Sequence, residues 1–227
     1  MIPLRDSTRS RSIPIVTVIL IILNLYIFFR QSIMTDPQLE RFFIQYGLIP
    51  VLFTERLQDY SWFGVLYAPL VTSFFLHGSW FHVLFNMLYL WIFGDNIEDR
   101  LGHFRFILFY FLSGILANAA HFLTDINSPI PLVGASGAIA GVLGAYFITF
   151  PRARITSLIF VFIFFTIREI PAIVFLLFWF AINLFQGLSS SGSLSNTAWW
   201  AHIGGFLAGM FLMILLKKKE PRRTLPE

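Results

Sequence analysis

The chain has 227 residues, of which 57% are hydrophobic, 18% aromatic and 12% charged. Soluble domains carry roughly a quarter charged residues, so the composition excludes an ordinary soluble protein and predicts an all-α integral membrane protein. The chain contains no cysteine, which excludes disulfides, thiolate catalysis and cysteine-ligated zinc. The net charge of +4 is clustered beside apolar runs, a pattern typical of membrane topology rather than of nucleic-acid binding.

Apolar runs predict a bundle of six transmembrane helices within one domain, residues 1–227. A basic tail, residues 1–12, precedes the first run, and a second basic tail, residues 217–227, follows the last. Most runs approach the ~20 residues that a helix needs to cross the hydrocarbon core. The first run lacks a small-residue cleavage site, so we expect a retained helix rather than a signal peptide. The six predicted spans are residues 13–29, 73–94, 104–123, 134–150, 171–188 and 199–216.

Three connections between these spans have compositions of their own. Residues 30–72 are too polar to span but rich in aromatic side chains, among them Trp62, Phe63 and Tyr67, which favours an interfacial loop; a poorly ordered loop is the alternative. Residues 95–102 are predicted to form a charged turn. Residues 155–167 are apolar but short, so we expect an interfacial or re-entrant segment there.

The distribution of cations predicts the orientation of the bundle. Six spans place both termini on one side, and most of the cations fall on that side: Arg5, Arg9, Arg11, Arg100, Arg105, Arg152, Arg154, Arg168, Lys217, Lys218, Lys219, Arg222 and Arg223. The other side holds Arg30, Arg41 and Arg56. Cytoplasmic loops of membrane proteins carry the excess of Lys and Arg, so both termini are predicted to be cytoplasmic, in a cell (inner or plasma) membrane.

Four polar residues are predicted to lie at similar depths near the outer face. His82 and Asn86 are four residues apart and share one face of the second span. Ser136 opens the fourth span, and His202 lies near the start of the sixth. Polar groups inside spans are costly unless they are paired or functional, so their convergence points to a site.

Small residues indicate how these helices approach one another. In the fourth span small residues recur every four positions from Gly137, and in the sixth from Ala201 through Gly205. Such faces let helix backbones come close. We therefore expect Ser136 and His202 to come within hydrogen-bonding reach, with Gly134 and Gly137 freeing the backbone around the serine.

A serine beside a histidine predicts nucleophilic catalysis. The imidazole takes the proton of the Ser136 hydroxyl and thereby activates it. The backbone N–H of Ser136, the imidazole of His82 and the amide of Asn86 are candidate donors to an oxyanion. No aspartate in any span is placed to orient His202, so the prediction is a dyad without cofactor or metal.

Simpler interpretations of these residues remain. Ser136 also suits plain small-residue packing, and His82 and Asn86 also suit a tie between two helices. His77 is expected at the membrane interface. A metal site lacks the His-Glu-x-x-His pattern.

Four sequence blocks resemble the rhomboid intramembrane serine proteases in their six-span bacterial form. The blocks are His77-Gly-Ser-Trp-Phe-His82-Val-Leu-Phe-Asn86, Gly94-Asp-Asn-Ile-Glu98-Asp-Arg100-Leu-Gly102, Gly134-Ala-Ser136-Gly137 and Ala201-His202-Ile-Gly-Gly205. They occur in the family's order and cover nearly the whole membrane domain.

The resemblance implies a role for each matching residue. Ser136 would be the nucleophile and His202 the general base, with His82, Asn86 and the Ser136 N–H as the oxyanion hole. Glu98 and Arg100 would brace the cytoplasmic end of the second span. The loop over residues 30–72 would lie partly in the outer leaflet, and the fifth span would gate the entry of substrate. Substrates would be single-span membrane proteins, cut near the outer face.

Two departures and two rival functions accompany the resemblance; one departure is Ala68-Pro69, which stands where some members have Trp-Arg in the first loop. Ala140 stands where some members carry a tyrosine that stacks on the catalytic histidine, which leaves the orientation of His202 open. A catalytically inactive relative that binds membrane clients is one alternative. A small transporter is the other, although the sequence shows neither inverted repeats nor broken mid-membrane helices.

Overall fold

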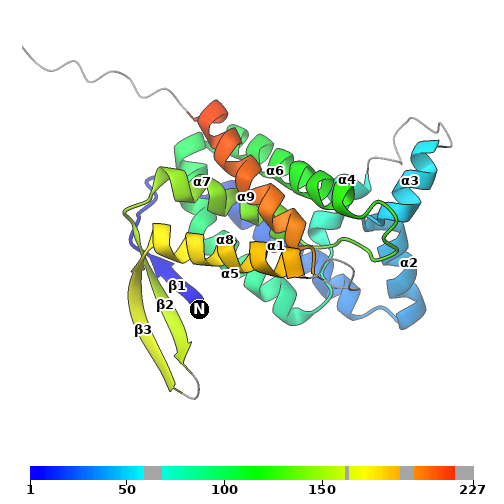
Figure 1. Cartoon of the computed structure of the whole chain (residues 1–227), viewed down its shortest axis with the longest axis horizontal. Coiled ribbons are helices and arrows are strands. Elements are labelled where there is room, and N and C mark those ends of the chain that lie inside the picture. The colour runs from blue at the N-terminus through cyan, green and yellow to red at the C-terminus, as the bar shows by residue number, and fades with distance from the viewer. Residues whose placement is uncertain (59–67, 162–163, 190–196, 218–227) are drawn as a thin grey trace, which may run out of the picture.

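The computed structural model describes residues 1–58, 68–161, 164–189 and 197–217. It is a bundle of helices with a small antiparallel sheet at one end (Figure 1). The elements in chain order are β1 (Ile2–Asp6), α1 (Ile15–Ser32), α2 (Asp36–Tyr46), α3 (Pro50–Gln58), α4 (Pro69–Thr72), the 3₁₀ turn η1 (Ser73–Phe75), α5 (Trp80–Leu101), α6 (His103–Thr124), α7 (Ser136–Thr149), β2 (Arg154–Val161), β3 (Phe164–Pro171), α8 (Ala172–Ser189) and α9 (Trp199–Leu216).

Six of the helices, α1 and α5 to α9, overlap the six predicted spans. Within the described ranges, α1, α6, α8 and α9 are long and apolar enough to cross a membrane, and α7 is a shorter apolar helix. Helix α5 begins at Trp80, later than the predicted start of the second span at residue 73. The reason is that Leu76 is extended and that the Ser79 hydroxyl caps α5 by accepting from the His82 backbone N–H at 3.2 Å. The predicted charged turn is instead the end of this helix, which continues to Leu101 and stops at Gly102 with φ 76°.

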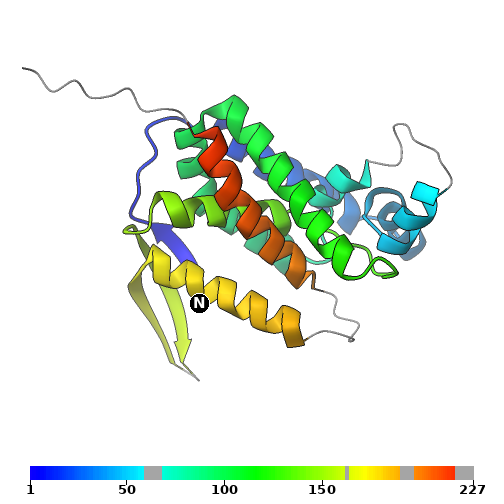
Figure 2. The ribbon, with the colours of Figure 1, turned by 45° about the horizontal axis from the view of Figure 1, so that its top comes forward.

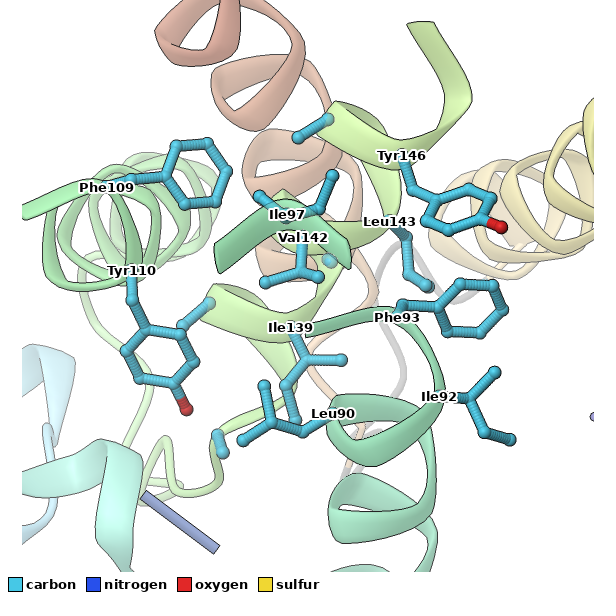
Figure 3. Close-up of a cluster of buried hydrophobic side chains, with 14 of the residues drawn as sticks. Leu90, Ile92, Phe93, Ile97, Phe109, Tyr110, Ile139, Val142, Leu143 and Tyr146 are labelled. Carbon is cyan, nitrogen blue, oxygen red and sulfur yellow. The ribbon is translucent and has the colours of Figure 1, made fainter. Parts of the chain in front are cut away.

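Helix α7 forms the centre of the bundle. Ten of its 14 residues are buried, and its small side chains let neighbouring helices close around it. At 1.5 Å per residue the helix is about 21 Å long, shorter than the ~30 Å hydrocarbon core. Figure 3 shows Val142, Leu143 and Tyr146 of α7 packed among apolar side chains of α5 and α6.

The backbones of α7 and α9 touch without intervening side chains. A Cβ on Gly209 would lie 1.9 Å from the carbonyl oxygen of Gly141, and a Cβ on Gly144 would lie 2.0 Å from that of Phe206. These separations are far below the 3.5–4.0 Å of an ordinary nonbonded contact. Only glycine therefore fits at these positions, and the two helices are locked together along a seam of small residues, here called the α7–α9 seam.

The prediction of an all-α fold is wrong at one end of the bundle. Residues 154–161 and 164–171 form the antiparallel pair β2 and β3, and β1 adds to the free edge of β2. The β-branched residues of this segment favour a pleated strand, and cross-strand partners such as Leu158–Ile167 and Phe160–Phe165 match apolar with apolar. Figure 2 shows the β2–β3 hairpin extending away from the helices.

The first residues of the predicted basic tail belong to this sheet. Asp6, at the end of β1, accepts hydrogen bonds from the Tyr146 hydroxyl at 2.5 Å and from Asn96 Nδ2 at 3.1 Å. Burial raises the pKa of the Asp6 carboxyl, while the hydrogen bonds from Tyr146 and Thr8 act in the opposite direction. The strand is thus fixed to α7 and α5. The second basic tail lies outside the described residues from position 218 onward.

The segment between the first two spans is largely helical where it is described. Helix α2 ends at Tyr46 and α3 begins at Pro50, and the Thr35 side chain and Gln38 form a capping box at the start of α2. The described part of this connection is therefore mostly helical, and its interfacial position stays a prediction. Trp62, Phe63 and Tyr67 lie outside the described residues.

Candidate active site

Ser136 is the first residue of α7, and the turn before it depends on Gly134. Gly134 has φ +120°, a conformation that favours glycine, and its N–H donates to the Ser73 carbonyl at 2.9 Å. A Cβ there would lie 2.8 Å from the ring of His82. The glycine is therefore required twice, for its backbone conformation and for the space that His82 occupies.

His202 lies on α9 and meets Ser136 directly. The distance from His202 Nε2 to Ser136 Oγ is 2.9 Å. The approach depends on the α7–α9 seam, because a Cβ on Gly205 would lie 2.2 Å from the carbonyl oxygen of Gly137. Gly137 itself faces α6, where its Cβ would lie 2.7 Å from that of Ala117. The structure thus brings together the two residues that sequence reasoning paired.

A third polar residue, Asn183 of α8, contacts the other side of the imidazole. Its Oδ1 lies 2.7 Å from His202 Nδ1, and its Nδ2 donates to the Trp179 carbonyl at 2.8 Å. The sequence argument looked for an aspartate and missed this amide. The available signal was a polar side chain inside an apolar run, which is costly in a span unless it is paired or functional.

Two tryptophan rings flank His202. The centroid of the Trp179 ring lies 5.9 Å from that of the imidazole, with an interplanar angle of 39°. The centroid of the Trp199 ring lies 6.1 Å from that of the imidazole, with an interplanar angle of 86°. Ala140 is fully buried within α7. The aromatic neighbours of the histidine therefore come from α8 and from the start of α9. His202 has aromatic neighbours even though position 140 is an alanine.

His82 and Asn86 lie on α5 beside the turn that precedes Ser136. The ring of His82 faces Gly134, and Asn86 Nδ2 would lie 3.7 Å from a Cβ at that position. The Asn86 amide also bonds His77 Nε2 at 2.9 Å. His77 is 1% exposed, so it is a buried partner of Asn86 within the protein, and its place at the membrane interface stays a prediction.

Glu98 and Arg100 lie at the far end of α5, remote from the serine. Glu98 is fully buried and accepts from the N–H groups of Val16 and Thr17 and from the Thr17 hydroxyl, all within 2.9 Å. Through these bonds Glu98 satisfies free N–H groups in the first turn of α1. The guanidinium of Arg100 lies over the Phe150 ring, 5.3 Å from its centroid, a cation–π geometry.

The arrangement around Ser136 has the parts that acyl transfer needs. A hydroxyl faces an imidazole nitrogen, and the first backbone N–H groups of α7 lack partners within the helix. Ala135, the residue before Ser136, makes no side-chain cap. Within the described residues no cluster of three or more His, Asp or Glu side chains is placed to hold a metal ion.

Comparison with known proteins agrees with the fold. The profile of the Rhomboid domain matches residues 65–219, a range that contains Ser136, His202, Asn183 and the α5 residues. The chain belongs to the rhomboid family. Together with its apolar helices, this membership makes it an integral membrane protein.

Individual rhomboid relatives match the same part of the chain. One relative is YdcA of Bacillus subtilis (strain 168), whose name describes it as a rhomboid protease. It is 32% identical over 157 residues, which are 68% of this chain and 69% of its own length. RHOMBOID-like protein 5 of Arabidopsis thaliana is 34% identical over 65% of this chain and 43% of its own. Rhomboid protease GluP of Bacillus subtilis is 35% identical over 63% of this chain and 24% of its own. The chain thus matches less than half of the length of the last two relatives.

Proposed function

We propose that this protein is an intramembrane serine endopeptidase in which Ser136 is the nucleophile and His202 the general base. The observation that carries the proposal is the 2.9 Å distance between Ser136 Oγ and His202 Nε2. In the first step the hydroxyl transfers its proton to Nε2 as Oγ attacks the scissile carbonyl. The imidazolium then donates that proton to the leaving amine, and a water molecule, activated in the same way, releases the acyl group.

The oxyanion of the tetrahedral intermediate would be held beside the start of α7. The N–H of Ser136, the imidazole of His82 and the amide of Asn86 are the proposed donors. One donor of this kind typically lowers the barrier by about 3–4 kcal/mol. The placement of His82 and Asn86 around Gly134 supports this role, and the bond from His77 restrains the Asn86 amide.

We also propose the six-span topology within a single domain, with both termini cytoplasmic. Contacts tie one end of the bundle together: Arg105 Nη1 donates to the Leu216 carbonyl, and Asp6 of β1 meets Tyr146 near the end of α7. These are the segments that carry most of the cations. Ser136 and His202 lie toward the opposite, outer end, so water for the reaction enters from outside. The segment over residues 30–72 would lie partly in the outer leaflet.

Single-span membrane proteins are the proposed substrates, as the family resemblance implies. We expect Ser136→Ala and His202→Ala each to abolish cleavage of a single-span reporter in liposomes, because each removes a reacting group. Gel electrophoresis of the reporter measures the product, and thermal unfolding in detergent verifies that both variants fold. Wild-type cleavage by Ser136→Ala would refute the proposal, as would a folded wild-type protein that binds reporters without cutting any. Solute flux that survives Ser136→Ala would favour a transporter instead.

A further inference from the structure

The side chain of Asn183 forms a fixed link between α8 and the imidazole of His202. It is 4% exposed, and both of its polar atoms have partners: Nδ2 donates to the Trp179 carbonyl one turn earlier, and Oδ1 lies 2.7 Å from His202 Nδ1. A buried polar group with both ends satisfied has one orientation. The amide is therefore not free to turn.

This orientation determines which imidazole nitrogen carries the proton. A backbone carbonyl only accepts, so the NH₂ group of Asn183 must face Trp179 and its oxygen must face His202. Because an amide oxygen also only accepts, His202 Nδ1 must carry hydrogen. In a neutral imidazole the other nitrogen, Nε2, is then the acceptor, and Nε2 is the atom that faces Ser136 Oγ.

We propose that Asn183 is a positioning residue that holds His202 in the Nδ1–H tautomer and so keeps Nε2 ready to take the proton of Ser136. The inference rests on the proposed function and adds to it the group that orients the base. When Nε2 gains the proton, Nδ1 keeps its own, so both nitrogens of the imidazolium donate, one to Asn183 Oδ1 and the other toward the leaving amine. The neutral amide stabilises that cation as a dipole.

Helix α8 restrains the imidazole in a second way. The Trp179 ring lies beside the His202 imidazole, tilted by 39° with 5.9 Å between the ring centroids, and the Trp179 carbonyl fixes the amide of Asn183. One turn of α8 thus sets both the rotation of the ring and its tautomer. Because α8 packs beside α9 at the side of the bundle (Figure 1), the orientation of the base depends on a different helix from the one that sets its distance to the serine.

Replacement of Asn183 tests this assignment. Asn183→Leu keeps the volume but removes the acceptor, so we expect kcat for reporter cleavage in liposomes to fall about 10- to 100-fold with little change in KM, since one or two hydrogen bonds are lost. Asn183→Asp keeps an acceptor toward Nδ1 but loses the donor to the Trp179 carbonyl, so we expect kcat to fall less than in Asn183→Leu, because only one of the two hydrogen bonds is lost. Gln186→Leu is the matched control, because it removes an amide from an exposed position on the same helix and should leave kcat unchanged.

A direct readout of the tautomer separates positioning from general support of the fold. With ¹⁵N-labelled histidine, and the His202 signals assigned by their loss in His202→Gln, nuclear magnetic resonance should show Nδ1 protonated in the wild type and in Asn183→Asp. Asn183→Leu should show a mixture or the Nε2–H form, and folded Asn183→Leu with wild-type kcat and wild-type tautomer would overturn the inference. If Asn183→Leu does not fold, loss of the Nδ1–H form in folded Asn183→Asp would overturn it equally. An active Ser136→Ala enzyme would instead refute the proposed function.

Discussion

Helices α7 and α8 approach His202 in opposite ways. Along the α7–α9 seam, backbone touches backbone, and a single methyl group at Gly209 has no room. Along α8, apolar side chains such as Val174 and Phe185 are more than half exposed, and a Cβ on Gly187 would meet its nearest neighbour at an ordinary 3.4 Å. One helix meets α9 backbone to backbone, and the other meets it through side chains.

The difference separates two properties of the proposed base. The distance from His202 to Ser136 depends on the seam, where neither backbone can move without displacing the other. The tautomer and rotation of the imidazole depend on side chains of α8. We therefore expect changes in the seam to alter stability and activity together, and changes in α8 to alter activity with less effect on stability.

The largest effect on stability is expected from a methyl group in the seam. Gly209→Ala places a Cβ 1.9 Å from the Gly141 carbonyl oxygen, and neither backbone can yield, so the free energy of unfolding should fall by about 3 kcal/mol, near the upper end for overpacked cores. Equilibrium unfolding in mixed detergent micelles measures this change. Cleavage should fall as well, because the displaced helix carries His202.

Gly187→Ala is the matched control on α8. Its added methyl group fits at normal contact distance, so the unfolding midpoint should stay near that of the wild type. Equal loss of stability in the two variants would remove the distinction between the seam and α8.

A smaller effect, on stability alone, is expected at Glu98. Glu98→Gln turns one carboxylate oxygen into an NH₂ group that faces existing donors, among them Val16 N–H and Thr17 N–H. A buried group left unsatisfied costs about 1–3 kcal/mol, so the unfolding midpoint should fall. The kcat of the folded fraction should not change, because this cluster is remote from Ser136.

Glu169→Gln provides the comparison for that substitution. Glu169 is 56% exposed, and its oxygen lies 4.0 Å from Arg154, a surface pair of the kind that contributes little. Its unfolding midpoint should match the wild type. A drop in kcat for folded Glu98→Gln would show that stability and catalysis are coupled beyond the seam.

The helices were predictable because hydropathy marks them locally. The predicted spans over residues 104–123 and 199–216 differ from α6 and α9 by at most one residue at each end. The sheet was not predictable in this way, since β1 pairs with a strand about 150 residues away and its own sequence reads as a polar tail. Hydropathy alone also does not distinguish an apolar strand from an apolar helix, so it did not reveal the β-branched character of residues 154–161.

The site was predictable only in part, for a similar reason. Topology placed Ser136 and His202 at one depth, and small residues indicated the close approach of their helices. The residue that contacts Nδ1 required knowledge of which face α8 turns toward α9, and neither spacing nor composition gives that rotation. Asn183 was therefore missed, as was the buried His77 beside Asn86.

The most direct test of the central claim is covalent labelling of the folded wild-type protein with a fluorophosphonate, followed by mass spectrometry of its peptides. An activated serine attacks phosphorus and displaces fluoride, so we predict one adduct, on Ser136, and its loss in both Ser136→Ala and His202→Ala. A wild-type protein that cleaves its reporter without an adduct on Ser136, or that is labelled equally in His202→Ala, would contradict the account.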